Sequence, residues 1–129
     1  MTAIRKNIAV VEDSPDTAEM FRVFLNQLCD DFNVCSFSNG PAFLETLQPS
    51  RYCAIILDIS LPGMDGFEVL QRTRSIDREI PAIALTAYAG QNYRQRALEA
   101  GFNDFVTKPI HDLDAFCRMV IKTARTRAA

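Results

Sequence analysis

Five short apolar runs, rich in β-branched residues, alternate along this chain with segments of helical period. The runs expected to be strands span residues 8–11, 34–37, 54–57, 82–85 and 104–107. Three of them are continuously apolar, which is typical of parallel strands buried on both faces. The strict alternation favours an α/β fold with an open, doubly wound parallel sheet of five strands and five helices.

The segments between these runs carry helix signals. Ser14 is an N-cap candidate for the first helix, and Pro15 suits its first position. An apolar stripe follows at i, i+3, i+4 and i+7, formed by Phe21, Phe24, Leu25 and Leu28. We predict a second helix that begins at Gly40, a third over 66–74 and a fourth over 92–100. The last helix carries a similar apolar stripe, formed by Leu113, Phe116, Val120, Ile121 and Ala124.

Composition restricts the class of protein. The chain has 129 residues, of which 48% are hydrophobic and 23% charged, and we expect one globular domain over residues 1–129. A net charge of −2 predicts neither nucleic-acid nor membrane binding. The four cysteines lack C-x-x-C spacing, and no apolar run approaches the ~20 residues of a membrane span, so a cytoplasmic location is expected.

Polar residues follow four of the five predicted strands. The first is followed by Glu12 and Asp13, the third by Asp58, the fourth by Thr86 and the fifth by Lys108. In open α/β sheets, ligands bind at the carboxyl ends of the strands, where the strand order reverses. We therefore expect these side chains to form one site.

Few ligands and reactions suit this set of side chains. Clustered carboxylates suit a hard cation such as Mg²⁺ or Mn²⁺. A lysine and a hydroxyl suit the oxygens of a phosphoryl group, and a carboxylate can itself be the nucleophile that forms an aspartyl-phosphate. No G-x-x-x-x-G-K-[ST] loop is present. The site therefore indicates a phosphoryl acceptor at Asp58.

Four ordered motifs resemble those of the receiver domain of two-component response regulators: VVEDSPD, LDISLPGMDG, IALTAYA and DFVTKPI. The resemblance extends from about residue 8 to the last helix. It implies a flavodoxin-like sheet in the order 2-1-3-4-5 and a role in phosphorelay signal transduction. By this resemblance Asp58 is the phosphoacceptor, Lys108 pairs with the phosphoryl oxygens, and Glu12, Asp13, Asp58 and the backbone carbonyl of Ser60 hold Mg²⁺ or Mn²⁺.

The resemblance also assigns switch and modulating residues. Thr86 and Phe105 match the family's switch pair, and Phe in place of Tyr removes a hydroxyl that a partner could recognise. Ser60 and Tyr88 flank the path of the attacking water, and since neither is a strong acid or an amide, slow self-dephosphorylation is expected. The peptide bond before Pro109 is expected to be cis.

The family's partners follow from the same resemblance. The phosphoryl donor would be a histidine kinase or a histidine phosphotransferase. A downstream protein would bind the face made by the fourth helix, fifth strand and fifth helix. Such a chain is a signalling receiver that catalyses its own phosphoryl transfer. Because it ends soon after the last helix, we expect no output domain in it. Both a stand-alone receiver and a receiver of a hybrid kinase fit the sequence.

Some of these residues also occur in other classes of protein or in purely structural roles. A phosphatase with an aspartyl-phosphate usually needs a second aspartate two residues past the nucleophile, where this chain has Ser60, and a cap insertion that is absent here. A pseudo-receiver would lack an acidic residue or the lysine, and none is missing. Glu12 and Asp13 could be helix first-turn charges, and Phe105 could belong only to the core. His111, the sole histidine, is expected at the surface.

Overall fold

The computed structural model describes residues 6–87 and 90–128. Strands and helices alternate along the whole of this part of the chain. The strands are β1 (Asn7–Val11), β2 (Asn33–Phe37), β3 (Ala54–Asp58), β4 (Ala82–Thr86) and β5 (Asp104–Thr107). The helices are α1 (Pro15–Leu28), α2 (Gly40–Thr46), α3 (Gly66–Ile76), α4 (Gln91–Ala100) and α5 (Leu113–Ala128).

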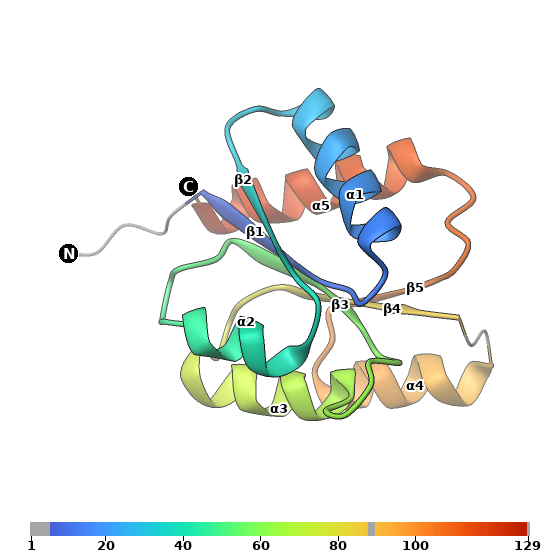
Figure 1. Cartoon of the computed structure of the whole chain (residues 1–129). Helices are drawn as coiled ribbons and strands as arrows, with labels where there is room; N and C mark the ends of the chain where they lie inside the picture. The colour runs from blue at the N-terminus through green and yellow to red at the C-terminus, as the bar shows by residue number, and fades with distance from the viewer. Residues whose placement is uncertain (1–5, 88–89, 129) are drawn as a thin grey trace.

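The five strands form one parallel sheet in the order β2-β1-β3-β4-β5, which confirms the predicted fold class. Helices α1 and α5 cover one face of the sheet, and α2, α3 and α4 cover the other (Figure 1). Strand β1 lies between β2 and β3, so the strand order reverses between β1 and β3. Both strands end at the edge where the sequence places the acidic residues.

Side chains from the central strands build a separate core on each face of the sheet. Ala9 and Val11 pack with α2 and α3, whereas Ile8 and Val10 pack with α1 and α5. Every residue of β3 and β4 is buried. This two-sided burial explains why the strand sequences are continuously apolar rather than alternating.

Local signals set most helix ends. The Ser14 side chain accepts a hydrogen bond from the Thr17 N–H (3.3 Å), as predicted for an N-cap. Asn39 and Asp65 cap α2 and α3 in the same way. Gly101 ends α4 in the left-handed region with φ 110°, a conformation that side chains disfavour.

The predicted stripe of α1 is only partly buried. Phe21 and Leu25 are in the core, but Phe24 is 37% exposed. Each residue turns a helix by about 100°, so Phe24 lies to one side of the face centred on Phe21 and Leu25. The buried face of this helix is therefore narrower than its apolar stripe.

Helix α5 is the longest helix of the structure as described, with 16 residues. No helix within residues 6–87 and 90–128 is long and apolar enough for a membrane crossing.

Candidate functional site

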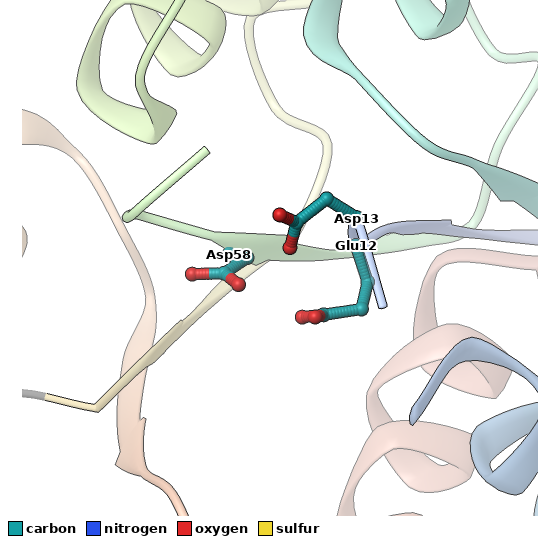
Figure 2. Close-up of side chains that lie close together, drawn as sticks. All are labelled: Glu12, Asp13 and Asp58. Carbon is teal, nitrogen blue, oxygen red and sulfur yellow. The ribbon is translucent and has the colours of Figure 1, made fainter. Parts of the chain in front are cut away.

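The three carboxylates predicted to meet do so at the carboxyl edge of the sheet. Val11 of β1 lies opposite Leu57 of β3, so the next residues, Glu12 and Asp58, are neighbours. Carboxylate oxygens of Glu12, Asp13 and Asp58 lie within 4.8 Å of one another. Figure 2 shows the three side chains pointing toward a common space from β3 and from the end of β1.

The Asp58 side chain is held in a fixed orientation at the end of β3. The residue is 3% exposed. Its Oδ1 accepts a hydrogen bond from the Ser60 N–H (2.8 Å), and its Oδ2 lies 2.9 Å from the Lys108 Nζ. The carboxylate therefore has one backbone donor and one cation as partners, and it lies beside two further negative groups.

Glu12 is also buried, at 3% exposure. Its Oε1 accepts hydrogen bonds from the Ser14 N–H and from the Lys108 ammonium, both at 3.2 Å. Its Oε2 lies 3.0 Å from the same ammonium but has no hydrogen bond of good geometry among the described residues. Burial, together with a hydrogen bond and charge repulsion from Asp58, raises the Glu12 pKa to about 7, although Lys108 opposes this.

Lys108 supplies the positive charge of the site. Burial alone would lower the pKa of its ammonium, but hydrogen bonds and charges from Asp58 and Glu12 outweigh burial and raise it. The Lys108 N–H donates to the Thr86 carbonyl (2.7 Å), which ties the ends of β4 and β5 together. The peptide bond between Lys108 and Pro109 is cis.

The donor set fits a divalent hard cation. All three side chains offer carboxylate oxygens, which Mg²⁺ and Mn²⁺ prefer. Among the described residues, the buried Oε2 of Glu12 has the Lys108 ammonium 3.0 Å away but no well-formed hydrogen bond, so a cation or its water could add a partner there. Asp13 is exposed, so the cluster is open to solvent on one side.

The remaining predicted residues fall on other strands and loops. Thr86 is fully buried at the end of β4, and Phe105 of β5, opposite Ala84, is 6% exposed. Ser60 is exposed, just past Asp58. Tyr88 lies outside the described residues. His111 is exposed, as predicted for a surface residue.

Gly66 supports the site in a way that residue types alone did not indicate. A Cβ atom at this position would lie 2.7 Å from the Asp58 carbonyl oxygen and 2.6 Å from the Ile59 Cα. The Gly66 N–H donates to the Ile59 carbonyl (2.9 Å). The first turn of α3 therefore lies directly against the backbone of the phosphoacceptor candidate, a contact that only glycine allows.

Comparisons with known proteins show what the chain is similar to. The model of the response regulator receiver domain matches residues 8–120. An uncharacterized 14.6 kDa protein in the sodA1 3′ region of Leptolyngbya boryana is 38% identical over 115 residues, which cover 88% of this chain and 86% of that protein. The cyclic di-GMP phosphodiesterase response regulator RpfG of Xanthomonas campestris pv. campestris is 33% identical over 120 residues, which cover 90% of this chain but 32% of RpfG.

A solved structure is also similar to this chain. The receiver domain of the sensor histidine kinase PA1611 from Pseudomonas aeruginosa was determined with a magnesium ion in its active site cleft. It is 30% identical to this chain, with a TM-score of 0.76, and the match covers 93% of this chain and 98% of that one. Similar chains thus occur both in a protein of about this size and as one part of much longer proteins.

Proposed function

Because this chain belongs to the response regulator receiver domain family, we propose that it accepts a phosphoryl group on Asp58 and signals by a change of its partner-binding surface. The observation that carries this proposal is the setting of Asp58. Its buried carboxylate lies between the Lys108 ammonium and the Ser60 N–H, next to Glu12 and Asp13. We treat the chain as one receiver domain.

The donor in this proposal is the phosphohistidine of a histidine kinase or a histidine phosphotransferase. A carboxylate oxygen of Asp58 attacks phosphorus, a P–O bond forms, and the P–N bond to the donor imidazole breaks. The imidazole leaves with the electron pair and takes up a proton. Lys108, already 2.9 Å from Asp58, is placed to pair with the phosphoryl oxygens.

Glu12, Asp13, Asp58 and the backbone carbonyl of Ser60 would hold the Mg²⁺ or Mn²⁺ ion. When bound, such an ion neutralises the negative charge that the phosphoryl group adds to the carboxylates. The chain's own residues orient the acceptor: Ser60 through its N–H, and Gly66 through its contact with the Asp58 backbone.

The proposed output surface is the face of α4, β5 and α5. Thr86 would bond the phosphoryl group, and Phe105 on the neighbouring strand would follow it. Phe105 is already buried, so this step would change how the ring packs rather than move it out of solvent. Leu98 on α4 is 45% exposed and could contact a protein partner.

The cellular setting is also part of the proposal. All four cysteines are free thiols, which suits a reducing, cytoplasmic location. Ser60 and Tyr88 supply no acid or amide to activate water, so we propose that the phosphoryl group is lost slowly. The chain then acts as a signalling module rather than a turnover enzyme.

Intact-protein mass spectrometry tests the proposed function. With acetyl phosphate and Mg²⁺ the wild type should gain one phosphoryl group, whereas Asp58→Asn or addition of EDTA should prevent the gain. Asp65→Asn is the matched control, because Asp65 lies in the same loop and asparagine can keep its N-cap bond to the Glu68 N–H. Equal labelling of Asp58→Asn and wild type would contradict the assignment.

A further inference from the structure

A groove lies between α1 and α5 at the edge of the sheet opposite Asp58. Its volume is about 470 Å³, and its walls come from the last turn of α1 and the second half of α5. Six residues line it: Leu28, Arg118, Ile121, Lys122, Arg125 and Thr126. Helix α1 starts where β1 ends and returns to the start of β2, so its last turn lies at the amino edge of the sheet (Figure 1). The groove is therefore separate from the phosphoacceptor site.

The rim of this groove is positively charged. Arg118, Lys122 and Arg125 follow one another on α5 at i, i+4 and i+7, so they share one side of the helix, and all three are exposed. Arg118 pairs with Asp114 of the same helix at 2.7 Å. Lys122 and Arg125 form no ion pair in the part of the chain that the structure describes. Two positive charges thus lack a carboxylate partner here, although the chain as a whole has a net charge of −2.

Neighbouring groups leave these two cations available to a ligand. The Arg125 guanidinium donates to the Cys29 Sγ (3.1 Å), and sulfur is a weak acceptor. Asp30 and Asp31, which follow the last turn of α1, are exposed, and neither forms an ion pair with any described cation. A carboxylate from another molecule would be a stronger partner for both cations than the sulfur or water.

The floor of the groove is apolar. Leu28 is half-buried, and Ile121 is 6% exposed. A ligand that suits this groove therefore carries an apolar group between negative charges. A free phosphate lacks the apolar group, and a lipid surface would need apolar side chains that project rather than a recessed floor. None of the lining residues is aromatic, so the groove offers nucleic-acid bases no ring for stacking.

We propose that this groove between α1 and α5 binds an acidic segment of a partner protein. An aliphatic side chain of that segment packs on Leu28 and Ile121, and its carboxylates pair with Lys122 and Arg125. Exposed ion pairs contribute little individually, so selectivity comes from the apolar anchor and the charges together. The groove gives the domain a docking point that does not depend on a phosphoryl group at Asp58.

NMR titration of the full chain with a short peptide, in which one leucine is flanked by glutamates, tests this proposal. The amide signals of Leu28 and of residues 118–126 should shift most. The same peptide with glutamine in place of glutamate should bind about tenfold more weakly, and with serine in place of leucine about fivefold more weakly. No shift at millimolar peptide, shifts confined to other faces, or equal binding of the glutamine peptide would overturn the proposal.

A pair of double variants tests whether the binding depends on the groove. Lys122→Gln with Arg125→Gln removes the two unpaired charges and should weaken binding of the acidic peptide roughly five- to tenfold. Arg78→Gln with Arg94→Gln is the matched control, because it removes two exposed charges outside the groove. The control should bind like wild type. Equal binding by the two double variants would contradict the assigned groove.

Three further probes separate the classes of occupant: inorganic phosphate, vesicles that contain phosphatidylglycerol, and a single-stranded oligonucleotide. If any of them shifts the same signals at the concentration of the acidic peptide, the groove is a general anion surface and the proposal is wrong. Acetyl phosphate should label Asp58 equally in wild type and in Lys122→Gln with Arg125→Gln. A wild type that takes up no phosphoryl group would contradict the proposed function and leave the peptide result standing.

Discussion

Buried ion pairs lie at both edges of the sheet, and they differ in charge balance. At the carboxyl edge, Lys108 pairs with Glu12 at 3.0 Å and Asp58 at 2.9 Å, and Asp13 lies close by. At the opposite edge, Asp77 pairs with Arg127. One cation thus faces three carboxylates at the first edge, whereas at the second edge one carboxylate pairs with Arg127 and also lies near the charge of Arg74.

The Asp77–Arg127 pair links three parts of the chain, although the buried Arg127 Nε has no hydrogen-bond partner among the described residues. The Asp77 carboxylate also accepts the Ser50 N–H (3.1 Å), so it connects the end of α3, the loop before β3 and the last turn of α5. The side chains of Asp77 and Arg127 are 7% and 11% exposed. The unbalanced cluster instead retains surplus negative charge in a partly desolvated site, which is suited to receive a cation. Burial of charge thus accompanies a structural link at one edge and the candidate cation site at the other.

Breaking the Asp77–Arg127 pair should have the largest effect on stability. Asp77→Ala leaves the Arg127 guanidinium nearly buried without an anion and removes the acceptor for the Ser50 N–H. We expect the free energy of unfolding to fall by about 3 kcal/mol in urea denaturation, because an uncompensated buried charge is costly. Phosphoryl labelling of Asp58 should persist at temperatures where the variant is folded.

An exposed pair provides the control for this change. Asp114→Ala makes the same substitution in the ion pair with Arg118, whose side chains are 58% and 66% exposed. This variant should lose about 0.5 kcal/mol or less. Similar losses of unfolding free energy in Asp77→Ala and Asp114→Ala would show that the Asp77–Arg127 pair does not hold the end of α5 in place.

The surplus negative charge of Glu12, Asp13 and Asp58 should make the stability of the fold depend on pH. The folded pKa of Glu12 is about 7, above the ordinary value of 4.5, so the folded state binds this proton more tightly than the unfolded state. In EDTA, the free energy of unfolding should therefore fall as pH rises from about 4.5 to about 7, by about 3 kcal/mol from this group, and then level off.

Glu12→Gln should flatten that part of the curve. Urea denaturation across this pH range measures the slope for both proteins. Glu45→Gln, an exposed substitution of the same kind, should keep the wild-type slope. An unchanged slope in Glu12→Gln would mean that Glu12 is not strained by its neighbours.

The fold was predictable because its signals are local. The apolar runs at 54–57 and 82–85 are buried strands, and Ser14 caps α1 as predicted. The strands of the structure end one residue later than predicted, at Asp58 and Thr86, because the hydrogen bonds between strands continue past the last apolar side chain. The exposure of Phe24 could not be predicted, because sequence spacing does not reveal how wide the buried face of a helix is.

The site was predictable because parallel strands bring their carboxyl ends together. That rule, with the receiver motifs, placed Glu12 and Asp58 side by side. The pair of Asp77 and Arg127 could not be found in this way, since 50 residues separate them and each lies at an ordinary helix end. The groove between α1 and α5 likewise depends on how these two helices lie against each other, which no local pattern encodes.

A thermal melt of wild type and Asp13→Asn, each in EDTA and in millimolar Mg²⁺, tests the surplus charge most directly. Mg²⁺ should stabilise the wild type by roughly 1–3 kcal/mol at about ten to a hundred times Kd, and the variant by less. Without metal, Asp13→Asn should be more stable than wild type by about 0.5 kcal/mol, because a like charge is removed. Asp16→Asn, an exposed substitution on α1, should match wild type in its response to Mg²⁺. A wild type that gains nothing from Mg²⁺, or an Asp13→Asn that melts lower in EDTA, would contradict an acidic cluster built to receive a cation.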